Sequence, residues 1–397
     1  MIVAGLMAGT SADALDVALV ELTLDESDGT APGGELAMDV LDFREVEFDE
    51  DLGLDILRLL EPRDVPLALV SSVDTRFGQA CADAVADACA RAGVTADLVV
   101  MHGQTVRHDV HDGAVTGTWQ IGQPAWVAER TGSPVLSDVR SRDVAAGGQG
   151  APLAGMLDHL LLAGADVPTA ALNLGGIANV TVVAPSRDTV AFDTGPANAL
   201  IDVMARRMSG DPRGVDTGGA LAARGVVVPA LLDDLLAEPY YALPAPKSTG
   251  KELFHAAYLD RFLAAHGGLD DHDVIATLTT LTARTVADAC HRYGVRSVVA
   301  SGGGTRNPTL MAALRRELGS GVAVGTTHDA LGLPEAAKEA CLMALVGWLS
   351  WHGLPATLPS VTGASHGTVA GRFTPGSAPL QLPEPRDDGP RRLRLAR

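Results

Sequence analysis

The sequence predicts an α/β protein of two lobes, each with a mixed β-sheet. The 397 residues exceed the roughly 250–300 residues at which one hydrophobic core usually stops growing. Short apolar runs alternate with Ala-rich segments of helical spacing, a pattern typical of mixed α/β sheets. Three glycine-rich turns, within 5–16, 173–198 and 301–307, each follow or interrupt a strand-like run. This arrangement indicates two lobes that grip a nucleotide.

The first part of the chain predicts strands, then helices, then further strands. Strands are expected at 3–7, 17–24, 38–48, 98–101 and 134–138, and helices at 52–60, 71–92, 125–130 and 154–163. Turn signals, such as the Gly-rich segment 28–34, separate the first three strands and predict a hairpin meander. The chain is expected to cross between the lobes near the last strand and helix.

The second part of the chain repeats this pattern in outline. Strands at 170–174 and 179–184 resemble the paired N-terminal strands, which predicts an approximate internal duplication. A third strand-like run ends at 191–196; helices are expected at 197–208, 228–237, 256–266, 277–293, 309–318 and 334–351, with a strand at 297–300. The predicted lobes are 1–130 with 345–375, and 131–344. Residues 376–397, rich in Pro, Asp and Arg, are predicted to be a disordered tail.

Charge and composition exclude several classes of protein. The net charge of -19 argues against a nucleic-acid surface, which needs clustered Lys and Arg. The four cysteines stand singly, without the paired spacing of a zinc site, and are expected to be buried reduced thiols. No apolar stretch reaches the roughly 18 residues of a membrane span, and the chain begins without a basic leader, so we expect a cytoplasmic protein.

The first glycine turn has the features of an anion site. Gly9, Thr10 and Ser11 would direct backbone N–H groups and hydroxyls at a phosphate. The Walker A spacing is missing and no lysine follows, so the phosphate charge would be met by backbone dipoles and a metal. Asp13 or Asp16 could hold Mg²⁺. An ordinary hairpin turn with polar residues is the alternative.

Two further groups of polar residues follow predicted strands. His102 comes directly after strand 98–101, where ligands of α/β sheets usually lie; a histidine bonded to a backbone carbonyl is the alternative. Arg140 stands near Asp138 and Asp143, and its guanidinium could bind a carboxylated or N-acylated sugar through two hydrogen bonds. A purely structural ion pair would give the same pattern.

The other two glycine turns could also approach a ligand. Asp193 is a lone carboxylate at the mouth of the second turn, where it could take a proton or hold a metal. Gly302, Gly303 and Gly304 follow a strand and precede a helix, so the backbone there could lie close to a flat or phosphorylated ligand. Many strand-to-helix turns carry such glycines without binding anything.

Taken together, these segments closely resemble the anhydro-N-acetylmuramic acid kinases of the actin and sugar-kinase superfamily, over residues 1–374. No single motif decides this; their order along the chain does. The motifs are Gly5-Leu-Met-Ala-Gly-Thr-Ser11, His102-Gly-Gln-Thr105, Trp119-Gln-Ile-Gly122, Asp138-Val-Arg140, Gly147-Gly-Gln-Gly-Ala-Pro-Leu153, Asn173-Leu-Gly-Gly-Ile-Ala-Asn179, Phe192-Asp-Thr-Gly-Pro196, Pro246-Lys-Ser-Thr-Gly250, Gly302-Gly-Gly-Thr-Arg-Asn-Pro308 and Pro359-Ser-Val-Thr-Gly-Ala364.

The resemblance implies a fold, a reaction and a set of site residues. The family fold has two actin-like (ribonuclease H-like) lobes with ATP in the interlobe cleft. The family reaction uses water to open the 1,6-anhydro bridge of the muramic sugar and transfers a γ-phosphoryl group to O6, which gives N-acetylmuramic acid 6-phosphate in peptidoglycan recycling. ATP and Mg²⁺ are the implied cofactors, and a homodimer is the implied assembly.

By the same resemblance, Asp193 is the general base that deprotonates the attacking water. The residues implied to bind ATP are Gly9, Thr10, Ser11, Ala12, Asp13, Ala14, Leu15, Asp16, Gly175, Gly176, Gly195, Gly302, Gly303, Gly304 and Asn307, with Asp13 also holding the metal. The residues implied on the sugar side are His102, Gln104, Arg140, Asp143 and Glu339. Ala14 stands where the family usually has glycine, and glycine adopts a positive φ more easily than alanine does. We therefore expect this departure to act on the geometry of the first phosphate loop.

Two other functions are compatible with the same pattern. An ordinary sugar kinase would use the aspartate to deprotonate a hydroxyl group. A non-catalytic actin-like ATPase would need polymer contacts or a peptide-binding domain, and the sequence suggests neither.

Overall fold

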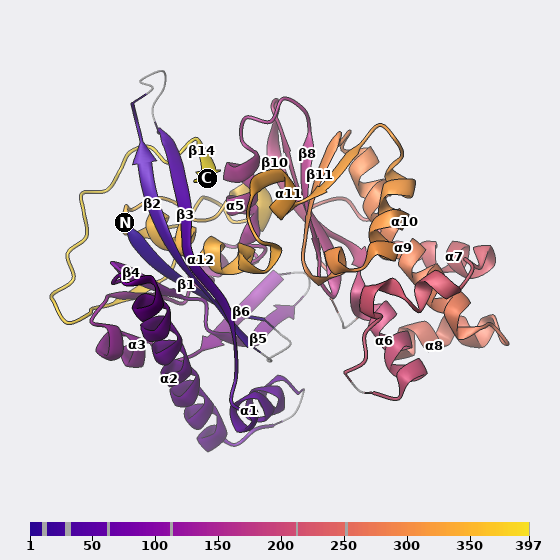
Figure 1. Ribbon diagram of the computed structural model, residues 1–397, viewed down its shortest axis with the longest axis horizontal. Helices are drawn as coiled ribbons and strands as arrows, with labels where there is room; N and C mark the ends of the chain where they lie inside the picture. Colours follow the sequence, from indigo (N-terminus) through magenta and orange to yellow (C-terminus); the bar gives the residue numbers. More distant parts are fainter. Residues whose placement is uncertain are drawn as a thin grey trace. The chain divides into compact units, whose positions relative to one another are not determined.

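The computed structural model describes residues 1–9, 14–27, 33–61, 64–111, 114–211, 213–250 and 253–396 (Figure 1). The chain forms two compact units: Met1–Ala163 with Ala337–Arg397, and Gly164–Ala336. These bounds differ from the predicted ones, because 131–163 and 337–344 belong to the first unit. There, β7 (Val135–Ser137) pairs with β4 (Leu98–Met101), and α12 (Lys338–Trp351) packs on β1 (Ile2–Ala8).

A seven-stranded sheet forms the centre of the first unit, in the order β13-β7-β4-β1-β2-β3-β14. β1 runs antiparallel to β2 and parallel to β4, which is in turn parallel to β7. The remaining strands of this sheet are β2 (Ala14–Asp25), β3 (Glu35–Glu47), β13 (Arg372–Thr374) and β14 (Arg392–Leu395). The predicted disordered tail therefore contains a strand: β14 pairs with β3, and its Leu393 is buried.

Helices cover both faces of this sheet. Alternate residues of a strand point to opposite faces: Ala4 and Leu6 of β1 belong to the same hydrophobic cluster as residues of α2 (Leu67–Ala92), whereas Gly5 faces α12. A side chain at Gly5 would lie 2.0 Å from the carbonyl oxygen of Ala340. Glycine therefore allows α12 to approach β1 closely, at the strand that leads to the first glycine turn.

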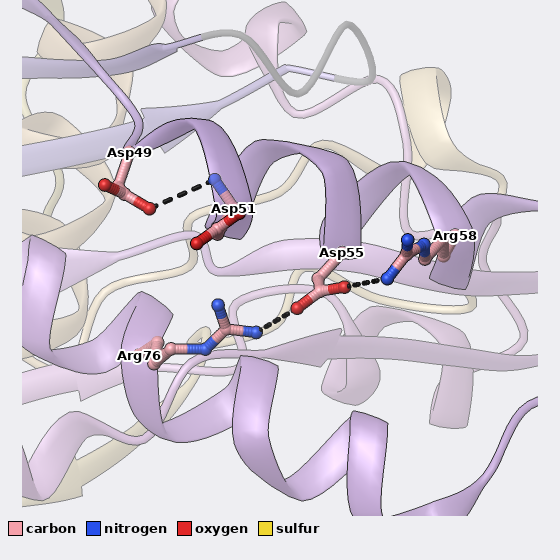
Figure 2. A network of polar contacts seen from close by, with 5 residues as sticks. All are labelled: Asp49, Asp51, Asp55, Arg58 and Arg76. Carbon is pink, nitrogen blue, oxygen red and sulfur yellow. Dashed lines mark hydrogen bonds and ion pairs between the residues drawn. The ribbon is translucent and has the colours of Figure 1, made fainter.

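The other helices of the first unit lie around this core. They are α1 (Glu50–Leu60), α3 (Pro124–Thr131), α4 (Ser141–Ala145), α5 (Ala154–Leu162) and α13 (Pro359–Thr362), and a separate hairpin is made by β5 (Gln104–His111) and β6 (Ala114–Ile121). Figure 2 shows how α1 is fixed: Asp49 caps its start, and Asp55 pairs with Arg58 and with Arg76 of α2. The hydrogen bond from Arg76 lowers the pKa of Asp55.

The second unit has a five-stranded sheet in the order β10-β9-β8-β11-β12. Its strands are β8 (Thr169–Leu174), β9 (Ile177–Ala184), β10 (Arg187–Pro196), β11 (Ser297–Ser301) and β12 (Ala323–Thr326). Three antiparallel strands are followed by two parallel ones, as in the series β3-β2-β1-β4-β7 of the first unit. This shared order confirms the predicted internal duplication and the predicted class of two mixed α/β units.

Helices of the second unit form two hydrophobic clusters. α9 (Asp271–Arg292) and α10 (Pro308–Leu318) contribute to the cluster beside the sheet, and α9 also packs in a helical cluster away from it. The other helices are α6 (Asn198–Ser209), α7 (Pro229–Leu236), α8 (Ala256–Ala265) and α11 (Thr327–Leu331). In Figure 1, α6, α7 and α8 gather beside α9, away from the strands. No helix among the described residues is long and apolar enough to span a membrane.

Candidate active site

The first unit brings predicted site residues to one edge of its sheet. β1, β4 and β7 are mutually parallel, so Gly9, His102 and Asp138, which follow them, lie at the same carboxyl edge, where open α/β sheets bind ligands. Gln104 is fully buried, and its Nε2 donates weakly to the carbonyl oxygen of Gly9 at 3.5 Å. Its Oε1 is buried and accepts no hydrogen bond from any described residue.

The first glycine turn is described only at its ends. Thr10, Ser11, Ala12 and Asp13 lie outside the described residues. Ala14, Leu15 and Asp16 are the first residues of β2 and pair with β3, and the Leu15 side chain is buried in the hydrophobic core. Ala14 pairs with Glu47 of β3 in this ladder, and extended backbone of this kind is open to alanine.

Arg140 and His102 form a hydrogen-bonded pair whose geometry fixes the histidine tautomer. The Arg140 Nε–H donates to His102 Nε2 at 2.8 Å, and His102 Nδ1 lies 2.7 Å from the carbonyl oxygen of Gly103. Since a guanidinium only donates, Nε2 must carry the lone pair and Nδ1 the proton. Both ring nitrogens are thus engaged within the protein. His102 orients Arg140, and Arg140 is the group that can bind a ligand.

Electrostatics keep this histidine neutral. Burial, followed by the positive charge of Arg140, lowers the pKa of His102 to about 3. Burial also lowers the pKa of Arg140 to about 10, while Glu339 and Asp143 raise it. Arg140 therefore stays charged near neutral pH. Its NH1 donates to the carbonyl oxygen of Gly150 at 2.7 Å. Apart from this bond and the Nε–H bond to His102, its N–H groups have no hydrogen-bond acceptor among the described residues.

If Arg140 binds the sugar that the family resemblance implies, we expect H102F to raise the KM for that sugar about tenfold, the effect of losing roughly 1.4 kcal/mol of orientation, with little change in kcat. Arg140 would lose its acceptor, whereas no proton transfer would be lost because the histidine is already neutral. Steady-state kinetics between pH 5 and 9 test this. If turnover instead fell by a factor of about 10² or more, with loss of one limb of the pH profile, His102 would be an acid–base group.

The depressed pKa of His102 also has a consequence for stability. The unfolded chain, with its ordinary histidine pKa near 6.5, binds a proton that the folded protein does not. This contribution to the free energy of unfolding keeps its full value above pH 6.5 and decreases as the pH falls from there toward 3. Thermal midpoints of wild type and H102F should therefore converge between pH 7 and 5.

The Asp143 side chain is hydrogen-bonded within the protein. It is fully buried; its Oδ2 accepts the Gly150 N–H and its Oδ1 accepts the Thr362 hydroxyl, both at 2.8 Å. The carboxylate thereby joins the glycine loop 147–150 to α13. Glu339, in the first turn of α12, reaches solvent. Loss of hydration raises its pKa, and the charges of Lys338 and Arg140 lower it.

A pocket of about 590 Å³ lies at the same edge of the first unit. His102, Trp119, Gln120, Asp138 and Arg372 are among its lining residues. Asp138 is the one non-glycine residue of the described chain with a left-handed backbone, φ 57°, a strain typical of functional sites. Its Oδ2 pairs with Arg372 at 3.0 Å. The Asp138-Val-Arg140 motif predicted a binding group here, but the ion pair of Asp138 with Arg372 was not predicted.

The second unit brings its two glycine turns together. β8 and β11 are parallel and in register, with Asn173 opposite Ser301. Gly302 has φ +85°, and a side chain there would lie 2.4 Å from Asn173 Oδ1. The turn at Gly175 and Gly176 lies beside it and accepts N–H groups from the start of α6. Glycine at 302 therefore allows the third glycine turn to lie directly against Asn173 and Leu174.

The predicted ATP-binding residues of the third glycine turn divide into two kinds. Gly303 has open space around it, so a ligand could approach its backbone. Gly304 is packed on Leu174. Asn307 is buried, and its Oδ1 accepts the Leu310 N–H at 2.9 Å as the cap of α10. Asn307 therefore shapes the turn, with its carbonyl oxygen turned to the helix.

Asp193 is held by a segment that sequence reasoning did not assign to it. It sits on β10 at a register shift before Gly195, and it is half-buried. Its Oδ2 accepts the Thr249 N–H at 2.9 Å, and its own N–H donates to the Lys247 carbonyl oxygen at 3.0 Å. The Pro246-Lys-Ser-Thr-Gly250 motif was the available signal, but its proximity to Asp193 depends on the tertiary fold.

Lys247 adds a positive charge near this carboxylate. Its Nζ donates to the carbonyl oxygens of Tyr240 and Tyr241 at 3.0 and 3.1 Å. Burial and Arg292 lower the pKa of Lys247, while Asp193 raises it. The Tyr240 hydroxyl donates to the carbonyl oxygen of Asp193 at 2.8 Å. Backbone and side-chain contacts together therefore fix where the Asp193 carboxylate lies.

The described residues can be tested for a metal site. They contain no group of three or more His, Cys, Asp or Glu side chains that could hold an ion. Mg²⁺ usually needs only one or two carboxylates when substrate phosphates supply further oxygens. The predicted ligand Asp13 lies outside the described residues.

Comparisons with known proteins place the chain in a family. The family model "Anhydro-N-acetylmuramic acid kinase" matches residues 1–376. The chain is 51% identical over 399 residues to the anhydro-N-acetylmuramic acid kinase of Streptomyces coelicolor, covering 100% of this chain and 99% of the relative. It is 53% identical over 396 residues to that of Streptomyces avermitilis, with 100% of both chains covered. The chain therefore belongs to the anhydro-N-acetylmuramic acid kinase family and is an enzyme of that kind.

Proposed function

We propose that this enzyme uses water to open the 1,6-anhydro bond of anhydro-N-acetylmuramic acid and transfers the γ-phosphoryl group of ATP to O6. The product is N-acetylmuramic acid 6-phosphate, formed in peptidoglycan recycling. Membership of the kinase family supports ATP and the sugar as substrates. The observation that carries the hydrolytic step is the half-buried carboxylate of Asp193, held at a glycine turn by the Thr249 N–H.

In this proposal Asp193 takes a proton from water as the water oxygen attacks the anomeric carbon. The bond between that carbon and O6 breaks, and O6 keeps the electron pair. O6 then attacks the γ-phosphorus, and ADP leaves. A positioned general base is worth roughly 10²–10⁴ in rate. The second step needs mainly positioning and neutralised charge.

The other residues bind and orient. Arg140, aligned by His102, donates N–H groups to the carboxylate or N-acetyl group of the sugar. Glu339 accepts a hydrogen bond from a hydroxyl group of the sugar. The Gly302–Gly304 turn lets the nucleotide approach the backbone. Mg²⁺, held with the phosphates and by Asp13, neutralises phosphate charge when bound. We also propose a cytoplasmic homodimer, on the family resemblance alone.

Labelled water tests the hydrolytic step. The enzyme is supplied with ATP, Mg²⁺ and the anhydro sugar in H₂¹⁸O, and the product is analysed by mass spectrometry. We expect the label at the anomeric hydroxyl in freshly formed product, with unlabelled phosphate on O6. An ordinary sugar kinase, in which Asp193 deprotonates a hydroxyl, would phosphorylate a free hydroxyl and leave the anhydro bond closed and unlabelled.

A further inference from the structure

A buried ion pair lies at the start of α12. Lys338 Nζ is 2.7 Å from Asp158 Oδ1, and the two residues are 6% and 4% exposed. Removing two charges from water offsets much of the free energy gained from their attraction. Such a pair is therefore weak evidence for stability, and apolar replacements of both residues are often neutral or stabilising. Its presence therefore calls for a role other than holding the fold together.

The pair joins two segments that are distant in sequence. Asp158 lies on α5, shortly before the chain leaves the first unit at Ala163. Lys338 is the first residue of α12, immediately after the chain returns at Ala337. α5 and α12 pack against each other within the first unit. The ion pair thus fixes the first turn of α12 against α5.

That first turn also carries Glu339. On one side, the close approach of Gly5 to Ala340 holds the same turn against β1. On the other, the positive charge of Lys338 lowers the pKa of Glu339, and the charge of Arg140 lowers it to a smaller extent. The charged groups around Glu339 are thus Lys338 on its own helix, Asp158 on α5, and Arg140 with Asp143 at α4.

We propose that Asp158 and Lys338 are positioning residues for Glu339: the pair sets the place of the first turn of α12 and keeps a positive charge beside the Glu339 carboxylate, so that Glu339 and Arg140 bind the sugar together. This inference deepens the proposed function and rests on its assignment of Glu339 to the sugar. Asp158 and Lys338 themselves are too buried to touch a substrate.

The test replaces both charges at once. K338M alone would leave a buried carboxylate without its partner and is expected to unfold more easily. D158L/K338M removes both charges and should keep a thermal midpoint close to that of the wild type. The variants are compared with R91M/D42L, which removes a less buried ion pair of the same unit with a separation of 2.6 Å.

We expect D158L/K338M to bind anhydro-N-acetylmuramic acid about tenfold more weakly by calorimetry, the equivalent of one lost charge-assisted contact. Without the Lys338 charge, Glu339 should take up its proton at higher pH, so the acid limb of binding should move to higher pH. In an E339Q background the same two substitutions should have no further effect on binding. R91M/D42L should resemble the wild type.

Three results decide the matter. Wild-type affinity and an unmoved acid limb in D158L/K338M would overturn the inference, and so would an undiminished effect in the E339Q background. Sugar binding is measured separately from turnover. A wild-type enzyme that binds the sugar through Glu339 but does not phosphorylate it would overturn the proposed function and leave this inference standing.

Discussion

D193N is expected to lower kcat for the anhydro sugar by roughly 10²–10⁴, the range typical of losing a general base. Asparagine retains an oxygen that can accept the Thr249 N–H, which the Asp193 carboxylate accepts at 2.9 Å. The backbone bonds to Lys247 and Tyr240 do not depend on the side chain. The loop should therefore keep its geometry, and ATP binding should change little. Steady-state kinetics and nucleotide binding by calorimetry measure the two effects separately.

A matched control lies on the same strand. Asp188 of β10 is exposed, so D188N makes the same chemical change away from the glycine turn and should leave kcat within about twofold, the usual scale of a neutral surface substitution. Full activity of D193N would exclude Asp193 as the base. A loss confined to ATP affinity would assign the carboxylate to the nucleotide instead.

The central strands of the two sheets could be predicted because their residues are apolar and bounded by glycine turns, whereas the edge strands β12 and β13 were not predicted. β4 was predicted at its observed bounds, and the repeated strand pairs indicated the duplication. β14 could not be predicted, since Arg392–Leu395 carries charged residues and its pairing with β3 depends on backbone hydrogen bonds to a distant segment. The β5–β6 hairpin was missed for a similar reason: most of its residues are polar or exposed and give no apolar face.

The environments of several predicted site residues could not be inferred from the motifs. Gln104, Asp143 and Asn307 were expected to face ligands. Each is buried, and the last two have side-chain oxygens bonded inside the protein. A linear sequence cannot distinguish a carboxylate that accepts N–H groups of its own loop from one that faces a substrate. The difference lies in partners such as Thr362, 219 residues away from Asp143.

The same distinction makes Arg140 the second position with a large expected effect. Two of its N–H groups are used to fix its orientation, on His102 and Gly150, and the remaining ones have no acceptor among the described residues. A guanidinium can orient itself and bind a planar acid group at the same time, because its donors form a rigid fork. An ammonium group, with three donors around one atom, cannot reproduce both sets of contacts.

We therefore expect R140M to reduce kcat/KM for the anhydro sugar roughly 10²-fold, the equivalent of about 3 kcal/mol for charge-assisted hydrogen bonds. R140K should recover less than about tenfold of this loss, since it restores charge without the fork. Most of the change should appear in KM, in contrast to D193N. R142M is the matched control, because Arg142 is exposed two residues away. A wild-type KM in R140M, with the fold intact by circular dichroism, would show that Arg140 only supports the loop at Gly150 and that another group binds the sugar.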